Sequence, residues 1–361
     1  MERSMGKLAS VAEALLTPHG VDRYLELVDP MLVRREIRGR VTAVRRQTPS
    51  TLTLTIRPSR AWRGFQAGQY VRVTVTIDGV RRTRCYSPAC SQYRADGQLE
   101  LTVKAIEDGL VSGYLHRHAE PGMVLGLSEP DGTFGLPDPR PDHVLLISGG
   151  SGLTPVLSML RTLADENHPG EVALLHYENE PADLPYRAEL AELVAGRPNF
   201  RVRFACTMTE RGGDLHGFFS RSHLEQVAPW FGEAETFLCG PVPLMDAVRK
   251  EYADEGLSER LHTEEFTPPA LAAADGDVTG QVRFTRSGKE FANSGKPLLE
   301  QAEDAGLRPE HGCRMGICFS CTQLKASGPV RNLRTGEVSA EDNEEIQLCI
   351  SAPCGDVEIN A

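Results

Sequence analysis

Four cysteines near the C-terminal end are spaced like ligands of a metal centre. Cys313, Cys318 and Cys321 form the pattern C-x4-C-x2-C, and Cys349 follows after 27 intervening residues. Four thiolates on a glycine-bearing loop favour a [2Fe–2S] cluster, because small residues let backbone N–H groups approach the sulfur atoms. The alternatives are a four-cysteine zinc site and buried free thiols, although zinc sites more often contain two short C-x2-C pairs.

Two glycine-containing turns in the middle of the chain could bind a phosphate group. The strand-like residues 143–148 lead into Gly149-Gly-Ser-Gly-Leu-Thr-Pro155 and then into apolar residues at helical spacing. We expect Thr154 to be the N-cap of that helix and Pro155 its first residue, so that backbone donors face an anion. The turn favours a pyrophosphate, although similar turns also arise for steric reasons alone. A second turn of this kind, Cys239-Gly-Pro-Val-Pro-Leu-Met245, supports the nucleotide interpretation.

The segments around these motifs predict three kinds of domain. Residues 39–107 alternate apolar and polar side chains with period two and contain Asp78-Gly79 as a hairpin turn, which implies an antiparallel barrel. From about residue 140 strand-like runs alternate with helical patterns, which implies a parallel sheet covered by helices. Near the end, residues 280–286 predict a strand and residues 297–306 a short helix that a glycine closes.

Length and composition narrow the function further. A chain of 361 residues with 40% apolar residues exceeds one hydrophobic core and is a multidomain globular protein. The net charge of −11 argues against binding of nucleic acid, whose partners are basic. No apolar run reaches the roughly 18 to 20 residues that span a bilayer. Glu13 interrupts the apolar N-terminal stretch and no cleavage site follows, so we expect a cytoplasmic location.

The order of the motifs resembles ferredoxin–NADP reductase-like iron–sulfur flavoproteins with a C-terminal plant-type ferredoxin domain, the order found in phthalate dioxygenase reductase-like components. The resemblance covers about residues 38–361. It rests on the residues Gly68-Gln-Tyr70, on R-x-Y-S at 84–87 and G-x-x-S at 109–112, on the two turns above and on the cysteine loop. The resemblance implies an N-terminal helical extension at 1–37, an FAD-binding antiparallel β-barrel domain at 38–138, an NAD(P)-binding α/β parallel-sheet domain at 139–266, a linker at 267–278 and an α+β (β-grasp) [2Fe–2S] ferredoxin domain at 279–361.

The same resemblance implies the binding residues. The FAD residues are Arg84, Tyr86, Ser87, Gly109 and Ser112, with FAD favoured over FMN because the G-x-x-S turn offers a pyrophosphate site. The nucleotide residues are Gly149, Gly150, Gly152, Thr154, Pro155, Cys239, Gly240 and Pro241. Tyr86, Ser87 and Cys239 orient the reacting rings and are not nucleophiles or general bases. Glu265 and Phe266 stand where the family places a residue beside the flavin ring. Thr209 and Arg211 favour NADPH over NADH, against the repulsion of Glu210.

These parts together predict an oxidoreductase that relays electrons. NAD(P)H gives up two electrons as a hydride, whereas a [2Fe–2S] cluster accepts one at a time, and FAD can mediate between them. The resemblance implies a protein acceptor, most of all a fatty acyl desaturase-type or another di-iron or Rieske oxygenase, with peripheral membrane contact allowed through that partner. The alternatives are a cytochrome P450 redox partner, a self-contained flavin or quinone reductase, and a regulatory iron–sulfur or zinc protein. An acidic run at 337–345 is either a solvated face or a dock for a basic acceptor.

Overall fold

The computed structural model of the chain describes residues 26, 28–33, 36–106, 109–266, 278–311, 316 and 319–361. Most of the predicted N-terminal extension, nearly all of the linker, and the predicted ligands Cys313 and Cys318 lie outside these residues. The chain divides into two compact units. One lies within Met1–Val75 and Tyr86–Glu264, and the other within Thr76–Cys85 and Glu265–Ala361.

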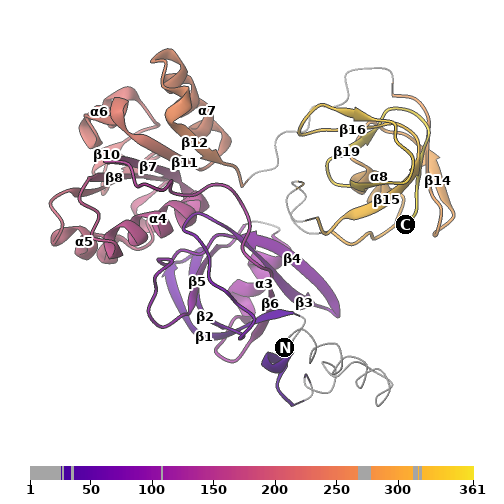
Figure 1. Ribbon diagram of the computed structural model, residues 1–361, viewed down its shortest axis with the longest axis horizontal. Helices are drawn as coiled ribbons and strands as arrows, with labels where there is room; N and C mark the ends of the chain where they lie inside the picture. The colour runs from indigo at the N-terminus through magenta and orange to yellow at the C-terminus, as the bar shows by residue number, and fades with distance from the viewer. Residues whose placement is uncertain are drawn as a thin grey trace, which may run out of the picture. The chain divides into compact units, whose positions relative to one another are not determined.

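The front of the chain forms a six-stranded antiparallel sheet in the order β4-β3-β6-β1-β2-β5 (Figure 1). On β3, Val71, Val73 and Val75 are buried and the residues between them are less so, which is the predicted period of two. Asp78 and Gly79 have φ values of 50° and 77°, as a two-residue hairpin turn with left-handed residues requires. The elements are β1 (Ile37–Thr48), β2 (Thr51–Pro58), β3 (Val71–Ile77), β4 (Val80–Tyr86), β5 (Leu99–Lys104), α3 (Leu110–His118) and β6 (Val124–Leu127), preceded by a 3-10 turn at Pro30–Leu32.

The middle of the chain forms a six-stranded parallel sheet in the order β10-β9-β8-β7-β11-β12. Helices α4 and α5 cover one face and α6 and α7 the other (Figure 1). The central strands β7 and β8 are almost entirely buried because helices cover both faces, which confirms the prediction of a parallel sheet. The strands are β7 (His143–Gly149), β8 (Glu171–Glu178), β9 (Phe200–Cys206), β10 (Leu215–His216), β11 (Glu235–Cys239) and β12 (Leu261–Glu264). The helices are α4 (Leu153–Asp165), α5 (Arg187–Ala195), α6 (Arg221–Val227) and α7 (Val242–Asp254).

The C-terminal part contains a five-stranded mixed sheet, β14-β13-β20-β15-β18, and a three-stranded sheet, β17-β16-β19. Its core joins apolar side chains of α8 to both sheets and includes Cys321 and Cys349. Gly306 follows α8 with a φ of 79°, as expected for a glycine that ends a helix. The elements are β13 (Gln281–Phe284), β14 (Lys289–Ala292), α8 (Leu298–Asp304), β15 (Thr322–Ser327), β16 (Val330–Asn332), β17 (Val338–Ser339), β18 (Glu344–Gln347), β19 (Ser351–Pro353) and β20 (Val357–Ile359).

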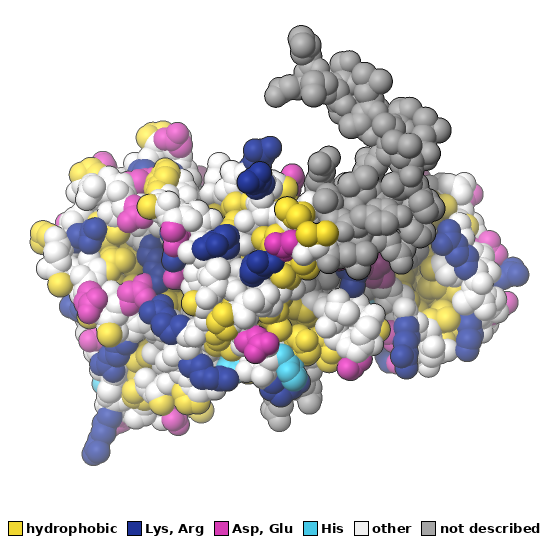
Figure 2. All heavy atoms as spheres, turned by 90° about the horizontal axis from the view of Figure 1, so that it is seen from below, with side chains coloured by type: hydrophobic (Ala, Val, Ile, Leu, Met, Phe, Trp, Pro, Cys, Tyr) yellow, Lys and Arg dark blue, Asp and Glu magenta, His cyan; other side chains and the backbone are white. Residues whose placement is uncertain are grey.

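The sequence predicts neither a basic surface for nucleic acid nor a membrane-spanning helix, and the structure bears on both expectations. On the face drawn in Figure 2, basic and acidic side chains are interspersed with apolar ones. Within the described part of the chain, every helix is too short or too polar to cross a bilayer.

Candidate active site

The two glycine-containing turns of the nucleotide sheet touch each other. β7 and β11 are parallel neighbours, and Ser148 pairs with Cys239 where both strands end. A Cβ atom placed on Gly152 would lie 2.1 Å from the carbonyl oxygen of Cys239, and one on Gly149 would lie 2.8 Å from Cδ of Pro241. Gly152 is therefore required by the close approach of one backbone to the other, and Gly149 by the packing of the Pro241 ring against it. The structure thus brings together residues that the sequence analysis assigned to two separate turns.

The start of α4 differs from the prediction. Thr154 is not the N-cap and Pro155 is not the first helical residue, because α4 begins at Leu153 with Gly152 as its N-cap. A short 3-10 turn at Gly150–Gly152 precedes the helix and shifts its start toward the N-terminus. The Thr154 hydroxyl instead donates to the Ser151 carbonyl over 3.2 Å. The turn still presents a helix N-terminus at the carboxyl edge of the sheet, where phosphate groups bind favourably.

The R-x-Y-S motif ends strand β4 and begins the next loop. Arg84 and Tyr86 are two residues apart on β4 and therefore share a face. Ser87 is only 1% exposed, and its Oγ has no hydrogen-bond partner among the described residues. An unsatisfied buried hydroxyl costs free energy, so this atom fits a site that a polar ligand completes.

The G-x-x-S motif forms the first turn of α3. Gly109 is the N-cap, and the Ser112 hydroxyl lies 3.4 Å from its carbonyl oxygen and 3.4 Å from the backbone nitrogen of Ile106. A Cβ on Gly109 would lie 2.3 Å from Ser112 Oγ, so the motif needs glycine there. Ser112 folds back on this turn, and a helix N-terminus such as that of α3 offers N–H groups to an anion.

A buried carboxyl group at the end of β12 was missed by the sequence analysis. Glu264 pairs in register with Cys239, and its Oε2 is buried without a hydrogen-bond partner among the described residues. Burial raises the pKa of Glu264 to about 8, so the group keeps a proton at neutral pH. Sequence reasoning chose Glu265, which is exposed, and Phe266. Two adjacent glutamates look alike in sequence, and only the structure shows that Glu264 ends β12 with a buried oxygen while Glu265, just after the strand, is exposed.

An ion pair beside the glycine turn was also missed. Lys104 Nζ, from the end of β5, lies 2.8 and 3.0 Å from the two carboxylate oxygens of Glu178 at the end of β8. A Cβ on Gly150 would lie 3.9 Å from that ammonium group. Burial alone would raise the pKa of Glu178, but the neighbouring His176 and Lys104 lower it below its ordinary value. The Lys104 ammonium group, held next to the glycine turn that precedes α4, can bind a phosphate group at that turn.

Three further predicted residues lie apart from these turns. Thr209 and Arg211 occupy an exposed loop after β9, where the Thr209 hydroxyl accepts a 3.2 Å hydrogen bond from the backbone N–H of Arg211. The loop stands at the carboxyl edge of the parallel sheet, as the NADPH hypothesis requires. Phe266 is half-buried and follows the end of β12 by two residues.

Two of the four predicted cluster ligands are described, and they lie together. Cys321 and Cys349 are both buried, and the backbone N–H of Cys349 donates to Cys321 Sγ over 3.5 Å. Leu348 N–H also bonds the Cys321 carbonyl. An N–H group directed at sulfur is the kind of hydrogen bond that stabilises a thiolate ligand. The arrangement fits the donor set of an iron–sulfur cluster.

Comparison with known proteins agrees with this geometry. Residues 39–135 match the oxidoreductase FAD-binding domain, and residues 146–250 match the oxidoreductase NAD-binding domain. The chain is 38% identical over 353 residues to an NADPH oxidoreductase of Mycobacterium tuberculosis, which covers 97% of this chain and 90% of that protein. It is 33% identical over 319 residues to the glycine betaine monooxygenase reductase subunit of Pseudomonas aeruginosa, which covers 82% and 87%.

Solved structures show the same fold. The structure of phthalate dioxygenase reductase matches with a TM-score of 0.58 at 24% identity, over 90% of this chain and 97% of that one. A cytochrome P450 reductase of Amycolatopsis matches with a TM-score of 0.58 at 29% identity, over 65% of this chain and 70% of that one. With both domain models matched in order and a relative aligned over nearly its whole length, the chain belongs to the FAD- and NAD-binding oxidoreductases of the ferredoxin reductase fold.

Proposed function

We propose that this oxidoreductase carries electrons from NADPH through FAD to a [2Fe–2S] cluster and on to an oxygenase-type protein acceptor. The observation that carries the proposal is the pair of buried thiols, Cys321 and Cys349, which lie together with an N–H group directed at sulfur. Cys313 and Cys318 complete the ligand set in the proposed ferredoxin domain at 279–361. A mixed sheet packed on a short helix supports a β-grasp interpretation of that domain.

The proposed FAD domain spans 38–138 and the proposed nucleotide domain 139–266. When bound, FAD supplies the ability to accept a hydride and to release its electrons singly. Arg84 offers a cation for a phosphate, Tyr86 a flat ring and Ser87 a hydroxyl that has no hydrogen-bond partner among the described residues. The N-terminal turn of α3, with Gly109 and Ser112, offers N–H donors to the pyrophosphate. These side chains bind and orient FAD.

The coenzyme is proposed to bind where the two turns meet. The residues assigned to it are Gly149, Gly150, Gly152, Thr154, Pro155, Cys239, Gly240 and Pro241. Cys239 is fully buried at the end of β11 and orients the nicotinamide. Arg211 and Thr209 would hold a 2′-phosphate, which favours NADPH. Relatives are named for either coenzyme: the Mycobacterium tuberculosis protein is an NADPH oxidoreductase, and one from Escherichia coli is an NADH oxidoreductase.

The proposed acceptor follows from what the relatives serve. One is a glycine betaine monooxygenase reductase, one a 3-ketosteroid-9-alpha-monooxygenase ferredoxin reductase component, and one a subunit of 1,2-phenylacetyl-CoA epoxidase. These names support a partner oxygenase, and we propose one of the desaturase, di-iron or Rieske type. A cytochrome P450 is the second candidate acceptor, because the solved P450 reductase of Amycolatopsis is 29% identical over its matched part.

Cluster analysis of two cysteine variants tests the proposal. The wild-type chain should contain about two irons and two acid-labile sulfides, together with FAD. Cys318→Ser should lose the iron and sulfide and the reduction of a protein acceptor, but keep NADPH-driven reduction of a small dye taken from FAD. Cys354→Ser, a change at an exposed cysteine of the same part of the chain, is the matched control and should behave as wild type. Wild-type protein with FAD but without iron would refute the cluster.

A further inference from the structure

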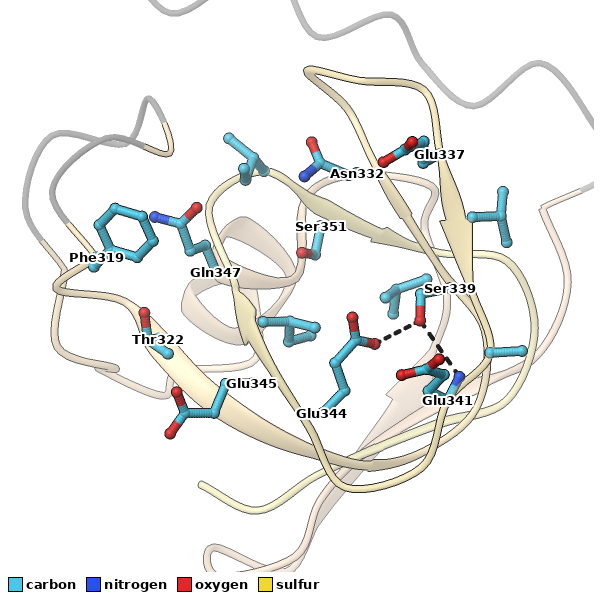
Figure 3. A pocket seen from close by; sticks show the side chains of 15 residues that line it. Phe319, Thr322, Asn332, Glu337, Ser339, Glu341, Glu344, Glu345, Gln347 and Ser351 are labelled. Atoms are coloured by element: carbon cyan, nitrogen blue, oxygen red, sulfur yellow. Dashed lines mark hydrogen bonds between the residues drawn. The ribbon is translucent and has the colours of Figure 1, made fainter. Parts of the chain in front are cut away.

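The C-terminal part carries a groove between the edges of its two sheets. The groove has a volume of about 670 Å³ and lies between β18 and β17 (Figure 3). Thr322 and Gln347 line it at one end, and Glu337 and Glu341 line it at the other. We call this space the acidic groove.

Carboxylates give the groove its charge. Glu337, Glu341 and Glu345 line it and are exposed, and no lysine or arginine is among the described residues that line it. Glu344 also lines it, but the fully buried Lys325 lies 2.8 Å from Glu344 Oε2 and the Ser339 hydroxyl lies 2.6 Å from it. Hydrogen bonds from Lys325 and then Ser339 lower the pKa of Glu344. The groove is therefore negative at neutral pH, which suits a cationic occupant. Lys325 and Ser339 hold the Glu344 carboxylate in place within it.

Two polar atoms at the other end have no hydrogen-bond partner among the described residues. Thr322 Oγ1 and Gln347 Nε2 are buried and make no hydrogen bond among the described residues. The Gln347 amide nitrogen is a donor, so it needs an acceptor such as a carbonyl oxygen. A bare metal ion or an isolated guanidinium group supplies no acceptor. An occupant that brings both cations and carbonyl groups, as a basic peptide segment does, would pair with the carboxylates and with these two polar atoms.

The two strands that border the groove are both sheet edges. Among the strands that the structure describes, β18 pairs only with β15 in the five-stranded sheet, and β17 only with β16 in the three-stranded sheet. The edge of a sheet presents unpaired backbone groups to which an extended segment can add as a further strand. Phe319 and Val338 are 61% and 53% exposed and lie in the lining, so apolar contacts are available as well.

The groove is next to the proposed cluster. Thr322 directly follows Cys321, and Gln347 precedes Cys349 by two residues. We propose that an extended segment of the acceptor protein, rich in arginine or lysine, docks in the acidic groove by adding a strand to β18. The inference rests on the proposed function, because it assigns this segment to the acceptor of the electrons. Docking here would place the acceptor beside the exit of the electron path.

Binding of a basic peptide to the full-length chain tests the docking site. The probe is a fluorescein-labelled peptide of alternating arginine and valine, and its affinity is read by fluorescence anisotropy. The same peptide with glutamine in place of arginine should bind at least about tenfold more weakly. The double variant Glu341→Gln/Glu345→Gln should weaken binding about tenfold, since it removes two exposed charge pairs with the peptide. The matched control, Glu290→Gln/Glu300→Gln, changes exposed carboxylates elsewhere in this part and should bind as wild type.

Strand addition has its own test. Successive N–H groups of a strand point to opposite sides, so methylating alternate backbone nitrogens of the peptide gives two isomers of equal charge. One isomer should lose binding about tenfold more than the other. Equal binding of both isomers would refute strand addition, and equal binding of the glutamine peptide would refute charge recognition. The double variant could also self-associate while its affinity for the peptide stays unchanged. That result would show that the carboxylates only keep the β18 edge from pairing with another copy of the chain, and it would overturn the proposal.

The outcomes separate this inference from the proposed function. Peptide binding needs no electron transfer, and iron and sulfide are measured on the same preparation. Protein that contains the cluster but does not bind the peptide overturns the docking site alone. Protein that binds the peptide but lacks iron overturns the proposed function and, with it, the assignment of the groove to an electron acceptor.

Discussion

Replacing Glu264 with glutamine tests whether the folded chain holds a proton on this buried carboxyl. Its pKa is about 8, against an ordinary value of 4.5. Between these values the folded state keeps the proton while the unfolded state loses it, so the free energy of unfolding falls as the pH rises. The stabilisation is complete below the ordinary pKa and is lost by about pH 8. At about 1.4 kcal/mol per pH unit, the free energy of unfolding falls by about 5 kcal/mol between the two pKa values. Glu264→Gln should abolish this pH dependence.

The assay is urea unfolding of both chains at about pH 5 and about pH 9, in the pH range where the carboxyl titrates. The chain has two tryptophans, and Trp230 packs against the core of the nucleotide sheet. A Trp62→Phe background therefore makes fluorescence report the unfolding of that sheet. Wild type should lose about 4 kcal/mol more than Glu264→Gln between the two pH values, because a pH of about 5 already lies a little above the ordinary pKa. The neighbouring Glu265→Gln, at an exposed carboxyl, should keep the wild-type slope.

Infrared spectroscopy gives a second measurement of the same proton. A protonated carboxyl band should be present in wild type at neutral pH, absent in Glu264→Gln, and lost with a midpoint near pH 8. Parallel pH slopes of the two chains, together with no such band at neutral pH, would refute the argument that burial keeps Glu264 protonated.

Three further predictions follow from individual contacts. Gly152→Ala should destabilise the nucleotide sheet by about 1–3 kcal/mol and weaken NADPH binding, because its Cβ would lie 2.1 Å from the Cys239 carbonyl oxygen. Urea unfolding measures the loss of stability. The control is Gly232→Ala, where the new Cβ meets nothing within 4 Å. Lys104→Gln should raise the Kd of NADPH at least about tenfold, the value of one charged hydrogen bond; titration calorimetry measures it, and an unchanged Kd contradicts the role of this cation. Lys325→Met should cost about 1–3 kcal/mol, because Glu344 loses the charged hydrogen bond from Lys325 and keeps the one from Ser339; thermal unfolding without a shift would contradict it.

Patterns along the chain predicted the regular elements well. Buried strands such as β7 and β11 appear as short apolar runs with a glycine at the end, and the hairpin at Asp78-Gly79 follows from residues that tolerate positive φ. The start of α4 was misplaced, because capping preferences identify good N-cap residues but do not reveal a 3-10 turn that begins the helix earlier.

Only the site residues that belong to a recognisable sequence motif were predictable. Residues inside the turns were named from the resemblance, whereas side chains that join distant segments were not. Lys104 and Glu178 are 74 positions apart, and only folding brings them together. The buried position of Glu264 depends on which face of β12 it occupies, and a four-residue strand at a sheet edge has too little periodicity to show this.

The contact between Gly152 and the Cys239 carbonyl means that the two turns cannot be altered independently. Any attempt to evolve a different coenzyme preference through one turn will meet epistasis from the other, although they are far apart in sequence. A library that varies both turns together should therefore yield functional variants that two separate libraries, combined afterwards, would miss.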